Sequence, residues 1–362
     1  MYVYIVMAFL IFIFGTSEKK RYMLYIKDNT LDSRLSNRRN IFYFLLVLTF
    51  LIIGGFRYRV GTDFGAYYAL YQTDWNELLT QFQKLDEPGI YLLTFLCRKI
   101  WDEGIFVIFV ENAVITLLIF RGIRSYRLEN ITMSLLMYMF YCGWAFSFNG
   151  IRQAIAMAII FAFSKQERKG WLIKYVLIVF VAFLFHKSAL FMLPILIIAH
   201  GKLCFRQLFF IVLFAILTPY FGEYALSYMG MLPNSTDVYF TNDINPLRII
   251  IACVPLLLIV LLYLKNQEEF FEKNCFIINM VIINAVLTYV TASSAYMNRF
   301  ARFTSVYIMI FFPKFSSRLT KKSQALFNII AISLYFIVFL VEIQSSGNLI
   351  PFQWSFSHFG EY

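Results

Sequence analysis

Five arginines stand at the edges of apolar segments: Arg57, Arg59, Arg152, Arg299 and Arg302. A charged side chain at the end of a membrane-spanning segment or inside it is energetically expensive, and by default it marks a functional site or cavity. For any single arginine, snorkelling to lipid headgroups is the alternative. The guanidinium group is always charged, and its planar fork of donors suits phosphate oxygens. Several such groups in one cavity favour a polyanion, and in a membrane this points to a lipid pyrophosphate.

Two further side chains are candidates for catalysis. Asp63 follows the first two arginines, and we expect them to depress the pKa of its carboxyl group, which would make it a poor acid but a good acceptor for a sugar hydroxyl. A purely structural ion pair of Asp63 with Arg57 or Arg59 is the alternative. His186 lies between two apolar runs, and its neutral imidazole can take the proton of an attacking hydroxyl. A buried interface histidine without catalytic function is the alternative for His186, which we place ahead of Asp63 as the base.

Polar and aromatic neighbours of these groups are candidates to hold a glycan acceptor: Thr62, Tyr67, Asn149, Gln153 and Tyr296. Aromatic residues at the membrane–water interface form an interfacial belt by default, and stacking on sugar rings is a second use. The sequence contains no Asp-x-Asp pair, no phosphate-binding glycine loop and no cluster of metal-ligating residues. We therefore expect neither metal nor cofactor, because arginines can stabilise a leaving pyrophosphate directly.

The elements that must position these residues are membrane helices. Hydrophobic residues make up 60% of the 362 residues, charged residues 15%, and the mean hydropathy is +0.68. This composition predicts a single all-α polytopic membrane domain over 1–362. Twelve spans are expected, several of them shorter than the roughly 20 residues of a straight crossing. Their bounds are 2–15, 41–56, 105–120, 131–148, 151–164, 171–186, 188–200, 207–221, 247–264, 275–292, 300–313 and 324–343.

Basic residues orient the chain. Most of the 32 Lys and Arg fall in alternate loops, which the positive-inside rule places in the cytoplasm. The same bias explains the net charge of +11 without nucleic acid as a partner. Both termini and the loops 57–104 and 222–246 then lie on the opposite side. Within that first loop, the connection 69–104 has a helical period with a polar face, which predicts an interfacial or re-entrant helix.

Five blocks of the chain resemble a known family. In order, they are "FRYRVGTDFGAYYALY", "EPGIYLLTFL", "SFNGIRQAIAMAIIFAFS", "FLFHKSALFMLPI" and "MNRFARF". They are similar to the blocks of the EpsG-like exopolysaccharide proteins, which are grouped with Wzy-type O-antigen and capsule polymerases. The positions that match are Arg59, Gly61, Thr62, Asp63, Tyr67, Arg152, Gln153, His186 and Arg299.

The resemblance implies a GT-C-like glycosyltransferase of the bacterial inner membrane with a periplasmic cavity. Such polymerases transfer a growing glycan from undecaprenyl pyrophosphate onto a lipid-linked repeat unit of O-antigen, capsule or exopolysaccharide. The expected partners are the undecaprenyl-pyrophosphate-linked oligosaccharide, the lipid bilayer and a chain-length regulator protein. An O-antigen ligase of the same fold and a flippase or transporter of lipid-linked oligosaccharides are the alternatives.

Overall fold

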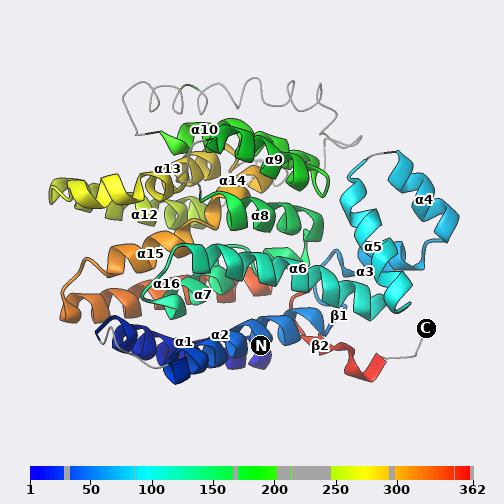
Figure 1. The fold of residues 1–362 in the computed structure, drawn as a ribbon, viewed down its shortest axis with the longest axis horizontal. Coiled ribbons are helices and arrows are strands. Elements are labelled where there is room, and N and C mark those ends of the chain that lie inside the picture. Colours follow the sequence, from blue (N-terminus) through cyan, green and yellow to red (C-terminus); the bar gives the residue numbers. More distant parts are fainter. Residues whose placement is uncertain are drawn as a thin grey trace.

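The computed structural model describes residues 1–27, 33–84, 86–165, 170–201, 213, 246–292, 298–345 and 347–358. Helices dominate these residues, and the long ones run side by side (Figure 1). The first half contains α1 (Tyr2–Lys27), α2 (Ser33–Gly55), β1 (Arg57–Tyr58), α3 (Phe64–Gln72), α4 (Trp75–Gln83), α5 (Pro88–Ile100), α6 (Gly104–Ser125), α7 (Ile131–Phe140), the 3-10 helix η1 (Phe146–Phe148), α8 (Ile151–Phe163) and α9 (Trp171–Phe183). The second half contains η2 (Lys187–Phe191), α10 (Met192–His200), α12 (Pro246–Leu264), α13 (Glu268–Val290), α14 (Asn298–Ser305), α15 (Ile308–Ser316), α16 (Lys321–Ser345), β2 (Gln353–Trp354) and η3 (Ser355–His358).

The apolar runs fold as helices because a chain in lipid must satisfy its backbone hydrogen bonds internally. Four described helices are long and apolar enough to cross a membrane, namely α6, α12, α13 and α16. Shorter apolar helices occupy most of the other predicted spans, while the span 207–221 lies outside the described residues. The chain is therefore an all-α membrane protein, and the number of twelve crossings stays a prediction.

Two predicted spans are not continuous helices. In the segment 131–148, α7 ends at Phe140, and Gly143 adopts a backbone φ of +129° before η1 begins. The segment 300–313 is divided into α14 and α15 by a turn in which the amide of Tyr307 donates to the carbonyl of Thr304. Irregular backbone at membrane depth is tolerated where it is buried in protein or lines a cavity. Both breaks lie close to the polar clusters described below.

Helix α8 is largely buried and packs between α6 and α9 (Figure 1). A side chain at Gly122 of α6 would collide with the ring of Phe161 of α8, so the glycine lets these two helices approach closely. Because α8 is surrounded by protein, its first turn carries Arg152 into the bundle and away from surrounding lipid.

Short elements gather at one end of the bundle. The helices α3, α4 and α5 occupy the connection predicted to be interfacial or re-entrant, and they project at the end where β1 and β2 meet (Figure 1). The two strands pair antiparallel, with Arg57 opposite Trp354 and Tyr58 opposite Gln353. This pair joins the segment after α2 to the segment after α16, so the chain closes on itself at this end.

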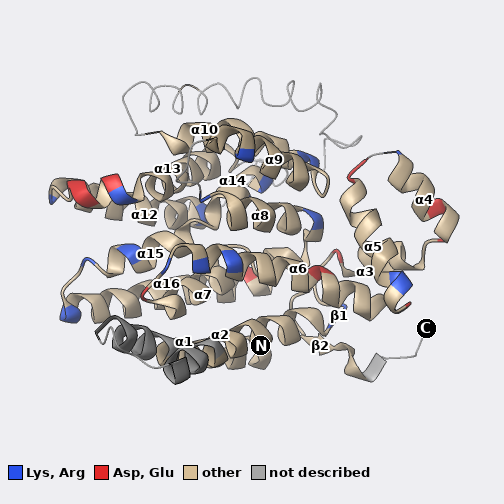
Figure 2. Cartoon of the chain, viewed as in Figure 1, with Lys and Arg blue, Asp and Glu red and all other residues tan. Residues whose placement is uncertain are grey.

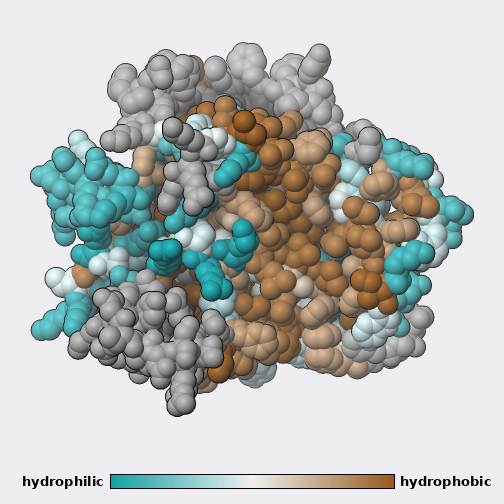
Figure 3. Space-filling view, in the orientation of Figure 1, coloured by the Kyte–Doolittle hydropathy of each residue, from teal (hydrophilic) through white to brown (hydrophobic). Residues whose placement is uncertain are grey.

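An apolar band separates this end from a basic one. Large apolar side chains are exposed around the middle of the bundle, for example Ile173, Leu257 and Ile329, and Figure 3 shows the band on one face between two hydrophilic ends. Lys and Arg gather at the turn joining α15 to α16, opposite α3–α5, whereas the turn joining α12 to α13 carries three glutamates beside two lysines (Figure 2). This asymmetry favours the predicted orientation, with the basic turns in the cytoplasm.

Candidate functional site

A single buried carboxylate, Glu87, joins two of the predicted site residues. Its Oε1 atom lies 2.7 Å from Nδ1 of His186 and accepts a hydrogen bond of 2.9 Å from the backbone amide of Lys187. Its Oε2 atom accepts a hydrogen bond from Nη1 of Arg152 at 2.5 Å. The side chain of Glu87 is only 7% exposed, so all three contacts are screened from solvent. The structure thus brings the candidate base and a candidate phosphate ligand to one anion.

The local sequence explains how Glu87 reaches this position. Glu87 adopts a left-handed backbone with φ +54°, and Pro88 then starts α5, where its missing amide hydrogen has no helical partner to lose. The amide of Gly89 donates to the carbonyl of Leu184 at 2.8 Å. A Cβ atom at Gly89 would lie 2.9 Å from that carbonyl, so only glycine allows α5 to start this close to the end of α9. His186 follows in extended backbone and faces Glu87.

The charge on Glu87 fixes the protonation pattern of His186. Burial alone raises the pKa of the Glu87 carboxyl, but the hydrogen bond and charge of His186, together with Arg152, outweigh burial and lower that pKa below its usual range. An ionised carboxylate can only accept hydrogen bonds. Nδ1 of His186 must therefore donate, so when the ring is in its neutral form Nε2 carries the lone pair and can accept a proton.

Tyr67 and Gln153 form hydrogen bonds with Arg152 and Arg299, respectively. The Tyr67 hydroxyl accepts hydrogen bonds from the backbone amide and from Nε of Arg152, at 3.1 and 3.3 Å. Burial raises the pKa of Tyr67 to about 12, so the phenol stays neutral. Nε2 of Gln153 donates to the backbone carbonyl of Arg299 at 2.6 Å and so ties α8 to α14. Arg152 keeps 43% of its side chain exposed and can still contact a ligand.

Asp63 lies at the N-terminus of α3 near these arginines. Its Oδ1 accepts a hydrogen bond from the Thr62 hydroxyl at 3.2 Å, and Asn149 Oδ1 accepts one from the Thr62 amide at 2.7 Å. Burial raises the pKa of Asp63, although Thr62 and the charges of Arg299 and Arg152 act in the opposite direction. The expectation of a depressed pKa is therefore wrong, because removal from water outweighs the nearby charges.

Arg57 and Arg59 do not join this cluster. Arg57 is 2% exposed, donates to the carbonyl of Gly54 and lies over the Phe148 ring, and it interacts electrostatically with the buried carboxyl group of Glu111 in α6. Arg59 is exposed and lies over the ring of the preceding tyrosine. Neither forms an ion pair with Asp63 within the described part of the chain. The contacts of Arg57 and Arg59 therefore lie apart from those that Arg152 makes with Glu87.

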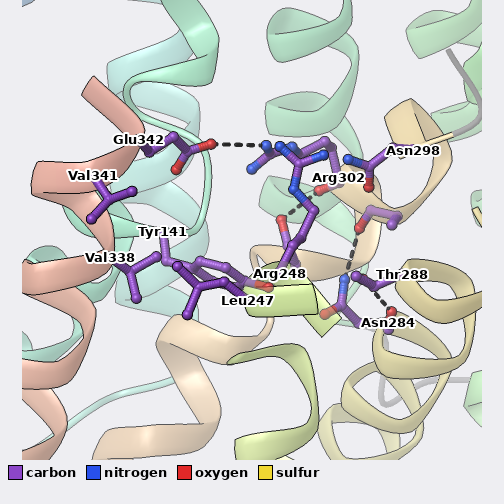
Figure 4. A pocket seen from close by; sticks show the side chains of 12 residues that line it. Tyr141, Leu247, Arg248, Asn284, Thr288, Asn298, Arg302, Val338, Val341 and Glu342 are labelled. Carbon is purple, nitrogen blue, oxygen red and sulfur yellow. Dashed lines mark hydrogen bonds and ion pairs between the residues drawn. The ribbon is translucent and has the colours of Figure 1, made fainter. Parts of the chain in front are cut away.

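Arg302 lines a neighbouring pocket. This cavity of about 90 Å³ lies between α12, α13, α14 and α16 (Figure 4). Nη2 of Arg302 lies 3.2 Å from Oε1 of Glu342, and the side chain of Arg248 points into the same space. Arg299 and Arg302 are three residues apart on α14, so one helix links this pocket to the Glu87 cluster. The remaining predicted residue, Tyr296, lies outside the described residues.

The comparison with protein families agrees with the blocks found in the sequence. The EpsG family model matches residues 40–354. The chain belongs to the EpsG family. No curated protein and no solved structure matches the chain. Membership in the EpsG family makes the chain a membrane protein of polysaccharide biosynthesis and confirms the predicted resemblance.

The sequence analysis missed several polar residues of this EpsG-family site. Glu87 carried a signal, because an acidic residue stands directly before the Pro-Gly start of a short helix in one of the family blocks. Glu342 lies inside the apolar run 324–343, and a carboxylate within a predicted span indicates function by default. Arg248 stands at the edge of a span, as the other arginines do, and only its position opposite Arg302 distinguishes it.

Proposed function

We propose that this EpsG-family chain is a polysaccharide polymerase. It transfers a growing glycan from undecaprenyl pyrophosphate onto a lipid-linked repeat unit at the periplasmic face of the bacterial inner membrane. The observation that carries the proposal is the buried Glu87 carboxylate, which holds the histidine base and an arginine phosphate ligand side by side. A general base next to a cation is the arrangement that glycosyl transfer from a pyrophosphate requires.

In the proposed reaction, the acceptor hydroxyl oxygen attacks the anomeric carbon of the donor glycan. The bond from that carbon to the pyrophosphate oxygen breaks, and the leaving lipid pyrophosphate keeps the electron pair. Nε2 of His186 takes the hydroxyl proton, and Glu87 stabilises the resulting imidazolium across their 2.7 Å contact. Base catalysis of this kind contributes about 10² to 10⁴ in rate.

The cationic groups stabilise the departing charge. Arg152 and Arg299 both act electrostatically on Asp63, so both lie near the turn over which the acceptor hydroxyl is proposed to arrive. Asp63 and Thr62 then orient that hydroxyl by accepting or sharing hydrogen bonds. Tyr67, Asn149 and Gln153 are proposed to act indirectly, by positioning the arginines and the Thr62 turn.

The pocket of Arg302 supports a lipid-borne anion. Two arginines and one carboxylate line it, which leaves an excess of positive charge for a phosphate group. The same cavity is lined by Leu247 and Val341, which are apolar side chains exposed at the outer surface of the bundle (Figure 4). A cationic interior with an apolar border suits a pyrophosphate that is attached to a polyprenyl chain.

The test is turnover by the purified full-length protein in nanodiscs with a lipid-linked repeat unit, read as a ladder of chain lengths. We expect Arg152→Ala to reduce polymerisation by about 10²-fold or more, because it removes a charge-assisted contact made in the transition state. Arg152→Lys is the matched control, since it keeps the charge but not the fork of donors. Its rate of polymerisation should lie between the rates of the unmodified chain and of Arg152→Ala. Long chains made by Arg152→Ala at a normal rate would overturn the proposed role of this residue.

The same assay separates the polymerase from its alternatives. A ligase would transfer the glycan to a lipid A core acceptor and make no longer chains from the repeat unit alone. A transporter would move labelled lipid-linked oligosaccharide across the vesicle membrane without any change in chain length. Either outcome would overturn the proposed polymerase.

A further inference from the structure

A second cavity, of about 460 Å³, is lined by Gly61 and Thr62 of the Gly61–Asp63 turn but not by His186 or Arg152. It lies over the outer face of α3 and reaches the segment that follows α16 at Asn348. None of the polar contacts of Glu87 extends into it. Its volume falls in the range of about 300–1,000 Å³ that is usual for small-molecule sites.

The floor of this cavity consists of small residues. Gly65 and Ala69 are four residues apart on α3, so they lie on the same helix face, and both are exposed. A Cβ atom at Gly65 would meet no other atom within 4 Å. Close packing therefore does not require glycine at position 65, although glycine is unfavourable in a helix. What the small residue provides is open space above the helix.

The rim is polar, and part of it is held in an unusual backbone conformation. Arg59 and Asn348 are exposed residues with φ of +49° and +51°, a region that side-chain-bearing residues seldom adopt. The amide of Gly61 donates to the carbonyl of Asn348 at 3.1 Å, which fixes the two sides of the rim to each other. Such strain persists only where the surrounding structure holds it, and it gathers at ligand sites.

The chemistry of the walls favours a saccharide. The lining offers a guanidinium from Arg59, a hydroxyl from Thr62 and amides from Gln72 and Asn348, so it supplies both hydrogen-bond donors and acceptors. The rings of Tyr58, Phe64 and Tyr68 close the sides. A lipid tail would find too many polar groups here, whereas a sugar presents hydroxyls and apolar ring faces to both kinds of wall.

The position of the cavity relates it to the proposed reaction. Thr62 lines the cavity, and the next residue, Asp63, lies within electrostatic range of Arg152 and Arg299. A glycan lying over α3 would therefore lie next to the Thr62–Asp63 turn, which is proposed to orient the acceptor hydroxyl. We propose that this cavity is a saccharide-binding subsite that holds sugar residues of the glycan beyond those that react. The proposal rests on the proposed polymerase function and adds the place of the non-reacting sugars.

The test uses substitutions at Gly65, which has no part in the catalytic cluster. Gly65→Leu projects a side chain into the open cavity, while Gly65→Ala is the matched control that adds one methyl group. The probe is the repeat-unit oligosaccharide released by acid from the polymer, free of lipid and phosphate, and binding to the full-length protein in nanodiscs is measured by saturation-transfer NMR. We expect the unmodified chain and Gly65→Ala to bind, and Gly65→Leu to lose at least tenfold in affinity. Ala69→Phe, on the same open face, is the second variant if Gly65→Leu fails to fold.

The outcomes of binding and turnover are separable. Arg152→Ala should keep saccharide binding while it loses polymerisation, because Arg152 does not line this cavity. Gly65→Leu should make shorter chains while it keeps the rate of the first transfer. If the protein binds the oligosaccharide through Gly65 but makes no polymer, the subsite stands and the polymerase function fails. The subsite proposal is overturned if the unmodified chain shows no saturation transfer, or if Gly65→Leu binds the oligosaccharide as tightly as the unmodified chain.

Discussion

The buried carboxylate of Glu87 forms hydrogen bonds with a histidine, an arginine and a backbone amide at the same time. A buried charge is stable only when it is paired and hydrogen-bonded, and here each partner depends on the same two oxygens. The cluster therefore acts as a unit, and removal of its central charge should affect both the base and the cation.

We expect Glu87→Gln to lower polymerisation by about 10²-fold or more, because a neutral amide neither fixes the His186 tautomer nor stabilises its charged form. Breaking the buried pair should also lower the free energy of unfolding by about 3 kcal/mol. Asp86→Asn is the control, since Asp86 is exposed and its ion pair with Lys187 contributes little. Turnover and thermal unfolding of both variants in nanodiscs provide the measurement. Equal rates for the two variants would contradict a central role for Glu87.

The lowered pKa of Glu87 gives a pH signature. A carboxyl whose pKa is depressed in the folded protein stabilises it above the ordinary carboxyl pKa, and this contribution is lost as pH falls through the depressed value. The difference in unfolding temperature between the unmodified chain and Glu87→Gln should therefore be constant above about pH 5 and shrink below the ordinary glutamate pKa of about 4.3. Thermal unfolding of both chains over a series of pH values tests this prediction. A difference in unfolding temperature that grows as the pH falls would contradict it.

Residue types were easier to predict from the sequence than side-chain directions. Spacing places Arg57 and Arg59 two residues apart, which puts both on one face of an extended strand. The left-handed backbone at Arg59 breaks that pattern, so Arg57 is buried while Arg59 faces outward. Glu87 could not be paired with His186 by spacing either, because 99 residues separate them and packing alone brings them together.

At the scale of elements, long apolar runs predicted helices well, since lipid leaves the backbone few other conformations. The ends of the helices were less predictable. The break between α14 and α15 depends on the turn at Thr304 and Tyr307, and the end of α7 depends on Gly143, and neither stands out within an apolar run.

The turn between β1 and α3 depends on one glycine. Gly61 has φ +96° and packs directly against the carbonyl of Phe148, so Gly61→Ala introduces both backbone strain and a clash. We expect this variant to displace Thr62 and Asp63, to lower polymerisation more than tenfold and to lose about 2 kcal/mol or more of stability. Gly65→Ala is the control with unchanged activity, because its helix is open there. The test measures the activity and thermal unfolding of both variants. Normal activity of Gly61→Ala would show that polymerisation does not need this turn.

At the scale of the whole molecule, charge and hydropathy divide the bundle into two ends and a band. The band of exposed apolar residues was predictable from composition, whereas its limits come from which helix faces turn outward (Figure 3). The orientation stays a prediction from the basic loops, since Lys and Arg are generally retained on the cytoplasmic side.

Single-cysteine labelling tests this orientation. In a chain without its native cysteines, Asp86→Cys lies in the connection before α5 and Lys321→Cys at the start of α16, and both positions are exposed. We expect a membrane-impermeant maleimide to label Asp86→Cys on intact spheroplasts and to label Lys321→Cys only after permeabilisation. Labelling in the reverse order would invert the orientation, and with it the compartment of the proposed reaction.

The pairing of β1 with β2 also has a consequence for biosynthesis. The segment that steadies the Gly61 turn is contributed by residues after α16, the last long helix, through Asn348 and Trp354. A ribosome-bound copy that has inserted its early helices still lacks this clamp. Each copy should therefore stay inert during translation and gain activity only when its final segment has been released and docked.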